Sequence, residues 1–375
     1  MSTMSNQTHT VTLIPGDGIG PEITAAMQSV TEASGVDINW DIQHAGEYAL
    51  ETTGELLPEA VLESIRRNKV ALKGPLTTPI GHGFRSLNVT LRKELDLYSN
   101  IRPAQSFHGT GARYDGVDIV LFRENTEDLY AGIEFEMGSE GVKRIAEVVE
   151  SLDAGTIRED AGLSLKPISI MGTRRIMKRA MDYAVANDRK KVTIIHKANI
   201  MKHTDGLFLR VCREVAAEYA ETAPEIEIDD LIVDFACTRL VTNPERFDVL
   251  VCPNLFGDIV SDLCAGLVGG LGLAPGANIG KDTALFEPVH GSAPSYAGQN
   301  LSNPTAIILS AVMMLRHLGE QCAAQRIHKA IAEVIEEGKV LTYDLMRMRD
   351  GTTDGSSGTK EYAAAIVSKL RDMEK

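Results

Sequence analysis

Residues 11–22 have the sequence VTLIPGDGIGPE. The apolar residues at the start of this stretch predict a buried strand, and the glycines at positions 16, 18 and 20 predict a tight turn. Pro21 is favoured at the first position of a helix, and apolar side chains from Ile23 to Val30 then recur at helical spacing. A strand, a turn and a helix in this order predict an α/β fold.

The same alternation returns along the chain, which predicts helices packed on mainly parallel strands. Residues 131–166 depart from it, being mixed and charged, and are expected to project from the body. The glycine-rich segment from Gly266 to Gly280 is expected to be a loop. The pattern predicts strands at Val70–Leu72, Ile119–Phe122, Val192–His196 and Val249–Cys252, and helices at Arg174–Ala186 and Thr204–Ala220.

The glycine turn differs from the dinucleotide-binding fingerprint of Rossmann folds. That fingerprint requires G-x-G-x-x-G, and Pro21 stands where the third glycine should be. The acidic residues about 20 positions further on, Asp37 and Asp41, lie in a stretch without clear periodicity. We therefore expect a tight turn beneath an active site and a fold that is not Rossmann.

Length and composition narrow the class of protein. A chain of 375 residues predicts two domains, or one with a large excursion. The net charge of −14 argues against nucleic acid and anionic membranes as partners. No apolar run reaches about 18 residues, and residues 1–10 lack the features of a secretory signal. Five cysteines without metal-binding spacing predict free thiols in a reducing compartment, so we expect a cytoplasmic protein.

A set of polar residues predicts a pocket for carboxylates. Ser86, Asn88 and Arg92 are spaced to fall on one face of a short helix. Arg102 and Arg123 add two guanidinium groups, and converging arginines bind carboxylates through paired hydrogen bonds. The alternative is that each arginine forms a surface ion pair.

Three aspartates predict a metal site. Asp258 and Asp262 are four residues apart, on one helical face, where their charges repel unless a cation lies between them. Together with Asp234 they offer hard oxygen ligands for Mg²⁺ or Mn²⁺. Such a pair is usually solvated surface, but the apolar neighbours in residues 254–265 favour metal binding, because buried unpaired charge is costly.

Two further residues are candidates for proton transfer. Lys197 directly follows a predicted strand, and the carboxyl ends of strands are where α/β sheets bind ligands. Tyr130 follows a polar turn. The alternatives are a solvated strand end for Lys197 and an aromatic residue at the rim for Tyr130.

Several sequence blocks, in order, resemble the isocitrate/isopropylmalate dehydrogenase family of β-decarboxylating dehydrogenases over almost the whole chain. Ser86 and Asn88 resemble the residues that the isocitrate branch of the family has at these positions. The chain as a whole most resembles bacterial homodimeric isocitrate dehydrogenases. The matching blocks are residues 14–20, 73–79, 123–130, 196–202, 254–262 and 290–294.

The resemblance implies an isocitrate/isopropylmalate dehydrogenase-like fold of two domains. Residues 1–97 and 269–375 would form a large α/β domain, and residues 98–130 and 167–268 a small one. Residues 131–166 would form a clasp through which two subunits interlock. Lys197 and Asp234 would then complete the active site of the neighbouring subunit.

The resemblance also implies the reaction, the oxidative decarboxylation of isocitrate to 2-oxoglutarate with Mg²⁺ or Mn²⁺ and a nicotinamide coenzyme. Lys197 would act as the base and Tyr130 as the acid. The cation would be bound by Asp234, Asp258 and Asp262. The substrate carboxylates would be bound by Thr78, Ser86, Asn88, Arg92, Arg102 and Arg123.

The residues expected at the coenzyme favour NADP, with NAD as the alternative. Tyr343 and Arg347 are similar to the phosphate-binding residues of NADP enzymes, and the acidic residue typical of NAD enzymes is replaced by Ser295. However, NADP enzymes generally have cationic residues where this chain has Ser295 and Asn243. The full expected set is Leu76, Thr77, Asn199, Glu287, His290, Gly291, Ser292, Ala293, Tyr296, Asn303, Tyr343 and Arg347.

Three alternatives stay open at this point. The chain could act on homoisocitrate, isopropylmalate or tartrate. It could also be a non-catalytic regulatory subunit that binds isocitrate, although such a subunit should have lost a reactive residue. Ser86 could be a site of phosphorylation, since a phosphate there would repel the substrate's carboxylate.

Overall fold

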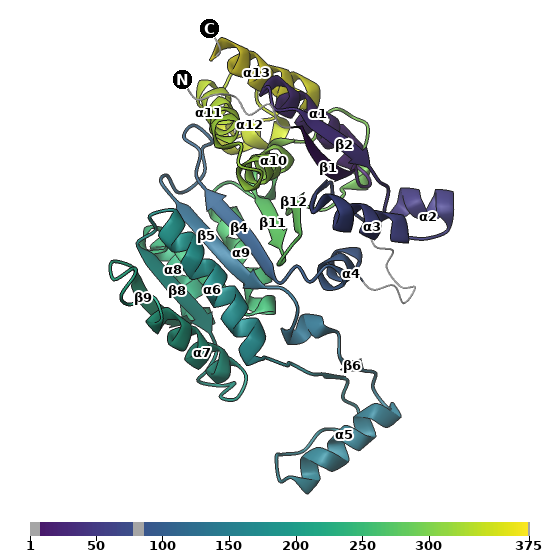
Figure 1. Cartoon of the computed structure of the whole chain (residues 1–375), viewed down its shortest axis with the longest axis vertical. Helices are drawn as coiled ribbons and strands as arrows, with labels where there is room; N and C mark the ends of the chain where they lie inside the picture. The colour runs from purple at the N-terminus through teal and green to yellow at the C-terminus, as the bar shows by residue number, and fades with distance from the viewer. Residues whose placement is uncertain (1–7, 78–85, 374–375) are drawn as a thin grey trace.

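A computed structural model describes residues 8–77 and 86–373. The described residues form a ten-stranded sheet, a two-stranded ribbon and helices on both faces of the sheet (Figure 1). The strands are β1 His9–Ile14, β2 Ile38–Ile42, β3 Val70–Lys73, β4 Ser99–Gln105, β5 Asp118–Glu124, β6 Glu134–Phe135, β7 Leu163–Ser164, β8 Lys191–His196, β9 Glu227–Ile232, β10 Val249–Cys252, β11 Pro275–Ile279 and β12 Ala284–Pro288. The α-helices are α1 Gly20–Ala33, α2 Glu47–Thr53, α3 Glu59–Asn68, α4 Leu87–Glu94, α5 Glu140–Ser151, α6 Ile170–Ala186, α7 Asp205–Ala217, α8 Val233–Thr242, α9 Asn254–Leu267, α10 Thr305–His317, α11 Gln321–Glu337, α12 Tyr343–Asp350 and α13 Thr359–Asp372.

The large sheet joins strands from both ends of the chain to strands from its middle. Its order is β2-β1-β3-β12-β11-β4-β5-β10-β8-β9. The ladders on both sides are parallel, whereas β11 pairs antiparallel with β12 and with β4, and β4 pairs antiparallel with β5. The prediction of mainly parallel strands is therefore confirmed, and the antiparallel strands lie at the centre.

The glycine turn after β1 contacts the segments that follow β3 and β12. Gly16 and Gly18 have φ angles of +84° and +58°, which favour glycine. A Cβ at Gly18 would overlap the carbonyl oxygen of Ser292. The amides of Asp17 and Ile19 donate to the carbonyls of residues 75 and 292 at 2.8 and 2.9 Å. The turn thus fixes the segments after β3 and β12 side by side.

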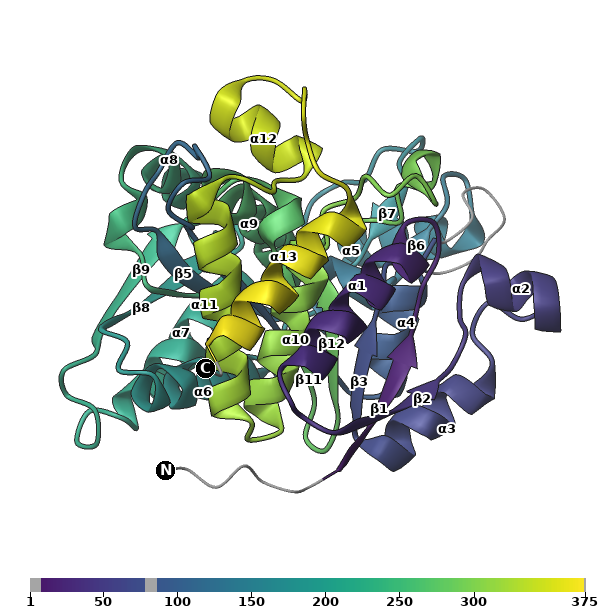
Figure 2. The same cartoon turned by 90° about the horizontal axis from the view of Figure 1, so that it is seen from above.

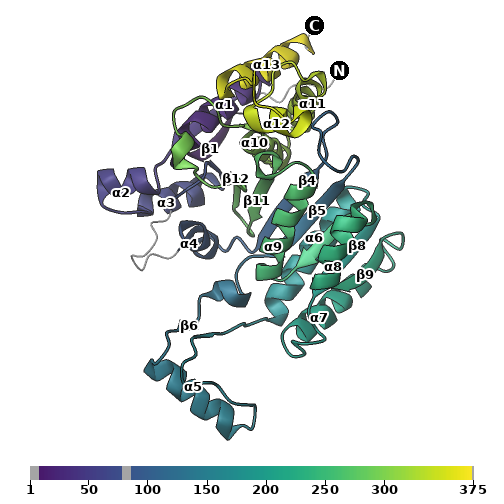
Figure 3. The ribbon, with the colours of Figure 1, turned by 180° about the vertical axis from the view of Figure 1, so that it is seen from behind.

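The core consists of four hydrophobic clusters. Each half of the sheet has two of them, one on each of its faces. On the middle-of-chain half, Val120 and Phe122 pack with α6 and α7, whereas the alternate residues Ile119 and Leu121 pack with α8 and α9. The other half combines α1, α10, α11 and α13 on one face and α3 and α4 on the opposite face. Figures 2 and 3 show these layers from above and from behind. The two-domain boundaries stay a prediction, which this division supports.

Residues 131–166 extend away from the body as β6, α5 and β7, as Figures 1 and 3 show. The side chains of Met137, Val148 and Leu152 are 62%, 55% and 72% exposed. The expected projection is confirmed. Apolar side chains this exposed on a projecting segment are typical of a surface that another chain covers.

One expectation for the fold is wrong. The segment from Gly266 to Gly280 is a loop only around its middle, because Gly266 and Leu267 belong to the last turn of α9 and residues 275–279 form β11, which is buried between β12 and β4. Gly269 and Gly270 adopt positive φ angles in the turn. The glycines suggested a loop, but Gly276 lies in a strand. A glycine is suited to that place because a Cβ there would press on the carbonyl of Glu287.

The remaining secondary structure agrees with the sequence. The four predicted strands and two predicted helices all form. The ends of β10 are as predicted, and each of the others is shifted at one end or both. All five cysteines are free. Among the residues with described positions, no helix is long and apolar enough to cross a membrane.

Candidate active site

A cavity of about 110 Å³ lies where β3, β12, β11 and β4 meet α4. Alternation along the strands selects its lining, because Asn100 and Arg102 of β4 and Glu287 of β12 point to the face that carries α4 and α9. The predicted helix with Asn88 and Arg92 is α4, and Ser86 precedes its first residue. The side chains of Asn88 and Arg92 line the cavity, whereas Ser86 is exposed, and the binding of carboxylates by these residues stays a prediction.

Glu287 is the centre of a buried polar network. Its carboxylate accepts hydrogen bonds from Lys73 Nζ at 2.7 Å, Arg92 Nη2 at 3.0 Å and Asn278 Nδ2 at 2.7 Å. Burial alone would raise the pKa of Glu287, but Lys73 and Arg92 hold it well below its ordinary value. Asn278 Oδ1 in turn accepts from Asn100 Nδ2 at 2.7 Å. The network holds these charged groups in fixed positions through direct hydrogen bonds.

Two arginines join β4 and β5 to α9. Arg102 Nη1 donates to Ser261 Oγ at 2.7 Å and to Asp262 at 3.0 Å, and it lies 3.5 Å from Asp258. Arg123 pairs with Asp258 and donates through Nε to Asn254 at 2.9 Å. Burial, followed by the field of the other arginines, lowers the pKa of Arg123 to about 10. The guanidinium groups of Arg92, Arg102 and Arg123 thus lie close together, and the nearby carboxylates do not fully offset their positive charge.

Several polar atoms around the cavity are buried without a partner among the described residues. They are Arg92 Nε, Arg102 Nε, Arg123 Nη2, Asn88 Oδ1 and Asn100 Oδ1. Buried donors without acceptors are costly in a folded protein. Three such donors on neighbouring arginines indicate a site shaped for an anion with several carboxylates.

Tyr130 lies against Arg123 and Asp258. Its hydroxyl donates to Asp258, and the Arg123 guanidinium carbon lies 4.7 Å from its ring centroid. Burial and the hydrogen bond to Asp258 both raise the pKa of Tyr130. The hydroxyl therefore keeps its proton at neutral pH.

Asp258 and Asp262 lie on one face of α9, as predicted, but the reason given for a metal between them is wrong. Their side chains are 34% and 52% exposed, and both contact Arg102. The apolar neighbours lie on the opposite helical face, where Val260 and Cys264 are buried against the sheet. Burial, opposed by Arg102 and reinforced by Asp258, raises the pKa of Asp262. The two carboxylates still present oxygen atoms of the kind that bind hard cations.

Lys197 and Asp234 form a separate pair. They make an ion pair with each other at the ends of β8 and β9, and Asp234 is exposed. Within the parts of the chain with described positions, no three His, Cys, Asp or Glu side chains lie close enough to hold a metal ion. One chain therefore does not bring Asp234 to Asp258 and Asp262. Ile200 and Phe235, beside this pair, are 69% and 46% exposed.

Of the residues expected at the coenzyme, Glu287 lies in the buried network with Lys73 and Arg92. The others fall into two groups and one exception. Thr77 Oγ1 bonds Ser292 Oγ at 2.7 Å, and its amide donates to Asp17 at 2.8 Å. His290 follows in the same segment as Ser292, its Nε2 has no partner among the described residues, and burial lowers its pKa. Leu76 and Gly291 line the same cavity as His290, and Ala293 continues this segment with a positive φ.

The second group lies around α12. The rings of Tyr296 and Tyr343 are stacked, with centroids 5.9 Å apart, and Arg347 is exposed on the same helix as Tyr343. Asn303 donates to Asp344 at 2.9 Å. The exception is Asn199, which lies exposed beside Lys197. Thr78 lies outside the described residues.

Three residues of the site were not proposed from the sequence as ligands or catalysts. They are Lys73, Asn100 and Asn278, each buried at 1% exposure or less. A lysine that ends the apolar strand VALK is a signal that could have indicated Lys73. The two asparagines carry no such signal, since only the pairing of β4 with β11 places them opposite each other.

Comparisons with known proteins agree with this geometry. A family model described as isocitrate/isopropylmalate dehydrogenase matches residues 10–366. The chain is 51% identical to the mitochondrial isocitrate dehydrogenase (NAD) catalytic subunit 5 of Arabidopsis thaliana, covering 96% of this chain and 88% of that one. It is 43% identical to isocitrate dehydrogenase (NADP) of Archaeoglobus fulgidus, covering 96% and 92%.

A solved structure of isocitrate dehydrogenase from Methylococcus capsulatus superposes with a TM-score of 0.86 at 52% identity, covering 97% of this chain and 99% of that one. The expected fold class is therefore confirmed. The chain belongs to the isocitrate/isopropylmalate dehydrogenase family.

Proposed function

We propose that the protein is an isocitrate dehydrogenase that converts isocitrate to 2-oxoglutarate and CO₂ with reduction of a nicotinamide coenzyme. The observation that carries the proposal is a set of guanidinium nitrogens without partners among the described residues, on Arg92 and Arg102 in the lining of one small cavity and on Arg123, which shares Asp258 with Arg102. Isocitrate has three carboxylates, which would supply the missing acceptors. Asn88 and Ser86 on the side of α4 would contact the carboxylate that isopropylmalate lacks.

The site would be completed by a divalent cation held between Asp258 and Asp262. Both side chains offer oxygen atoms, and Asp262 is half exposed and close to Asp258 through their shared contact with Arg102. When bound, Mg²⁺ or Mn²⁺ supplies Lewis acidity toward the substrate's hydroxyl and its carbonyl product. Arg102 and Arg123 would then turn from these aspartates to the substrate carboxylates.

Proton transfer is assigned to Lys197 and Tyr130. Lys197 would accept the proton of the 2-hydroxyl as hydride leaves C2 for the coenzyme. After CO₂ leaves, Tyr130 would protonate the enolate carbon, since burial and Asp258 keep its hydroxyl protonated. Both roles need only ordinary general acid–base chemistry once the groups are in place.

Because Lys197 and Asp234 are paired with each other on an exposed surface, we propose that they serve the active site of a second subunit. A homodimer would cover the exposed apolar side chains beside them and those of the clasp. The acidic surface argues against nucleic acid and membranes as partners. The free thiols suit a reducing compartment, which we propose is the cytoplasm.

For the coenzyme we propose NADP, bound against Tyr296, Tyr343 and Arg347. Arg347 is exposed and forms no ion pair among the described residues, so it is free to pair with a 2′-phosphate. NAD is the second candidate. It is favoured by the NAD-type relative from Arabidopsis thaliana and by Ser295, where a further cation would suit NADP.

Steady-state kinetics on the purified protein test the function. We expect activity with isocitrate that is lost in excess EDTA and restored by Mg²⁺ or Mn²⁺. The kcat/KM for isopropylmalate, homoisocitrate and tartrate should be lower by about two orders of magnitude or more, because Arg and Asn groups would stay unpaired. A higher value for a competitor would assign the sister activity, and isocitrate binding without turnover would assign the regulatory role.

A further inference from the structure

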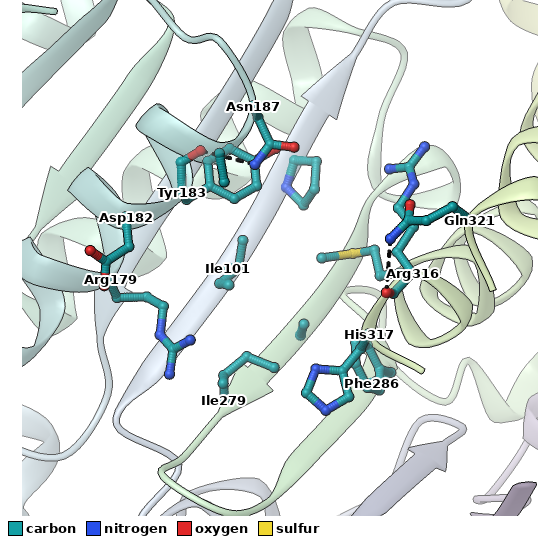
Figure 4. Close-up of a pocket in the computed structure, with 14 residues that line it drawn as sticks. Ile101, Arg179, Asp182, Tyr183, Asn187, Ile279, Phe286, Arg316, His317 and Gln321 are labelled. Carbon is teal, nitrogen blue, oxygen red and sulfur yellow. Dashed lines mark hydrogen bonds between the residues drawn. The ribbon is translucent and has the colours of Figure 1, made fainter. Parts of the chain in front are cut away.

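A second cavity lies on the other face of the central strands. It has a volume of about 390 Å³, within the usual range for small-molecule sites. Its floor is formed by Ile101 of β4, Ile279 of β11 and Phe286 of β12 (Figure 4). These residues alternate with Arg102, Asn278 and Glu287, which point to the active-site cavity. The two cavities are thus separated by the thickness of the sheet.

The walls of this cavity come from the two halves of the molecule. Helix α6 contributes Arg179 and Tyr183 on one side. Helix α10 contributes Arg316 and His317 on the other side, and Gln321 begins α11 above them (Figure 4). The floor and the side chain of Met313 are apolar, so the cavity combines an apolar base with polar groups at its mouth.

The charge in this cavity is mainly positive. Arg179 donates to Tyr98 Oη at 2.9 Å and to the carbonyl of Gly280 at 3.4 Å, but it has no carboxylate partner among the described residues. Arg316 likewise has no carboxylate partner within the described parts of the chain. Asp182 is the one acid among the described residues of the lining. It is bound to Lys178 at 3.0 Å and to the hydroxyl of Tyr219 at 2.5 Å.

The field of these arginines reaches the neighbouring histidines. Partial burial and then Arg179 hold the pKa of His317 below its ordinary value. Burial and Arg316 act in the same way on His328, which lies in an adjoining hollow that also contacts Arg316. An anion placed between the two arginines would gain charge-assisted hydrogen bonds from guanidinium groups that lack an acid.

We propose that this cavity is an effector site for a small organic anion with a flat apolar body, such as an aromatic phosphate or carboxylate. The ring would lie on Ile101, Ile279 and Phe286, and the anion would lie between Arg179 and Arg316. A ligand there contacts α6 and α10 together and so fixes how the two halves stand relative to each other. Because β4 and β11 carry Arg102 and Asn278 on their other face, its binding should change the affinity for isocitrate.

Calorimetry with 1-naphthyl phosphate as the probe tests the site, with inorganic phosphate and 1-naphthol as the charge-only and ring-only controls. All titrations are made in saturating coenzyme, so that binding at the coenzyme site is excluded. We expect the probe to bind at least tenfold more tightly than either control. Arg316→Gln should weaken it about tenfold or more, and Ala186→Trp, at the exposed rim, should block it.

The matched control is Arg174→Gln, which removes an exposed arginine on another face of α6 and should leave the probe's affinity unchanged. Equal binding of inorganic phosphate, or a probe affinity that neither Arg316→Gln nor Ala186→Trp lowers, overturns the site. The effect on isocitrate rests on the proposed function. If the probe binds but the measured isocitrate affinity is the same with and without it, the site stands and its effector role is overturned.

Discussion

Two pairs of oppositely charged residues in this molecule differ in their surroundings. Glu287 with Lys73 is fully enclosed, and three further side chains fix it from β11, β4 and α4. Lys197 with Asp234 lies exposed among uncovered apolar side chains. The enclosed pair is complete in one chain, because each charge has its partners. For the exposed pair we propose a role in the active site of a second subunit.

The largest expected effect concerns Asp258, the proposed metal ligand. Asp258→Asn keeps the size of the side chain but removes its charge, so it should lower kcat by about 10³-fold through loss of the cation. Circular dichroism should stay native, since the side chain is only partly buried. Full activity of wild-type protein in excess EDTA would contradict this assignment.

The next effect is on stability. Glu287→Gln leaves Lys73 and Arg92 buried without a carboxylate, so the free energy of unfolding should fall by about 3 kcal/mol. Glu59→Gln, which breaks an exposed pair with Arg66, is the control and should change it little.

The same carboxylate predicts a pH dependence. The pKa of Glu287 is depressed in the folded state, so its contribution is fully present above the ordinary value of 4.5 and is lost as the pH falls below it. Wild-type protein should therefore lose more stability than Glu287→Gln in urea titrations below pH 4.5. Parallel losses in both proteins would remove Glu287 from the account of acid unfolding.

The acid and the base should separate in partial reactions. Tyr130→Phe should lower overall turnover about 10²-fold while slowing reduction of oxalosuccinate, the ketone intermediate, much less. Lys197→Met should impair the hydride step itself. If the two variants have the same profile, the division of roles is wrong.

A smaller effect is expected at the coenzyme. Arg347→Ala should weaken the use of NADP about tenfold and leave the use of NAD nearly unchanged. Arg349→Ala, on the same helix, serves as the control. A wild-type kcat/KM that is clearly higher with NAD, or an Arg347 variant that loses both equally, would assign NAD.

The smallest expected effect tests whether Lys197 and Asp234 belong to the active site of a neighbouring subunit. Mixing Lys197→Met with Asp258→Asn should restore activity to roughly a quarter of wild type, because a hybrid dimer has one intact site. Subunit exchange is verified by mass spectrometry of differently labelled chains. Exchange without recovered activity would exclude shared sites.

The sequence by itself determined much of this protein. Residues 11–22 predicted the strand, the glycine turn and the helix, and the spacing from Ser86 to Arg92 and from Asp258 to Asp262 predicted two helical faces. Such patterns succeed because strand and helix periodicities are local properties of the chain.

Only the tertiary structure decided the rest. The glycines of residues 275–279 suggested a loop, yet β11 forms because β12 and β4 supply hydrogen-bonding partners from distant parts of the chain. The apolar neighbours of Asp258 suggested burial, yet the packing of α9 turns them to the sheet and the aspartates to Arg102. The asparagines that support Glu287 come together only through strand pairing, because contacts between residues far apart in sequence leave no local pattern.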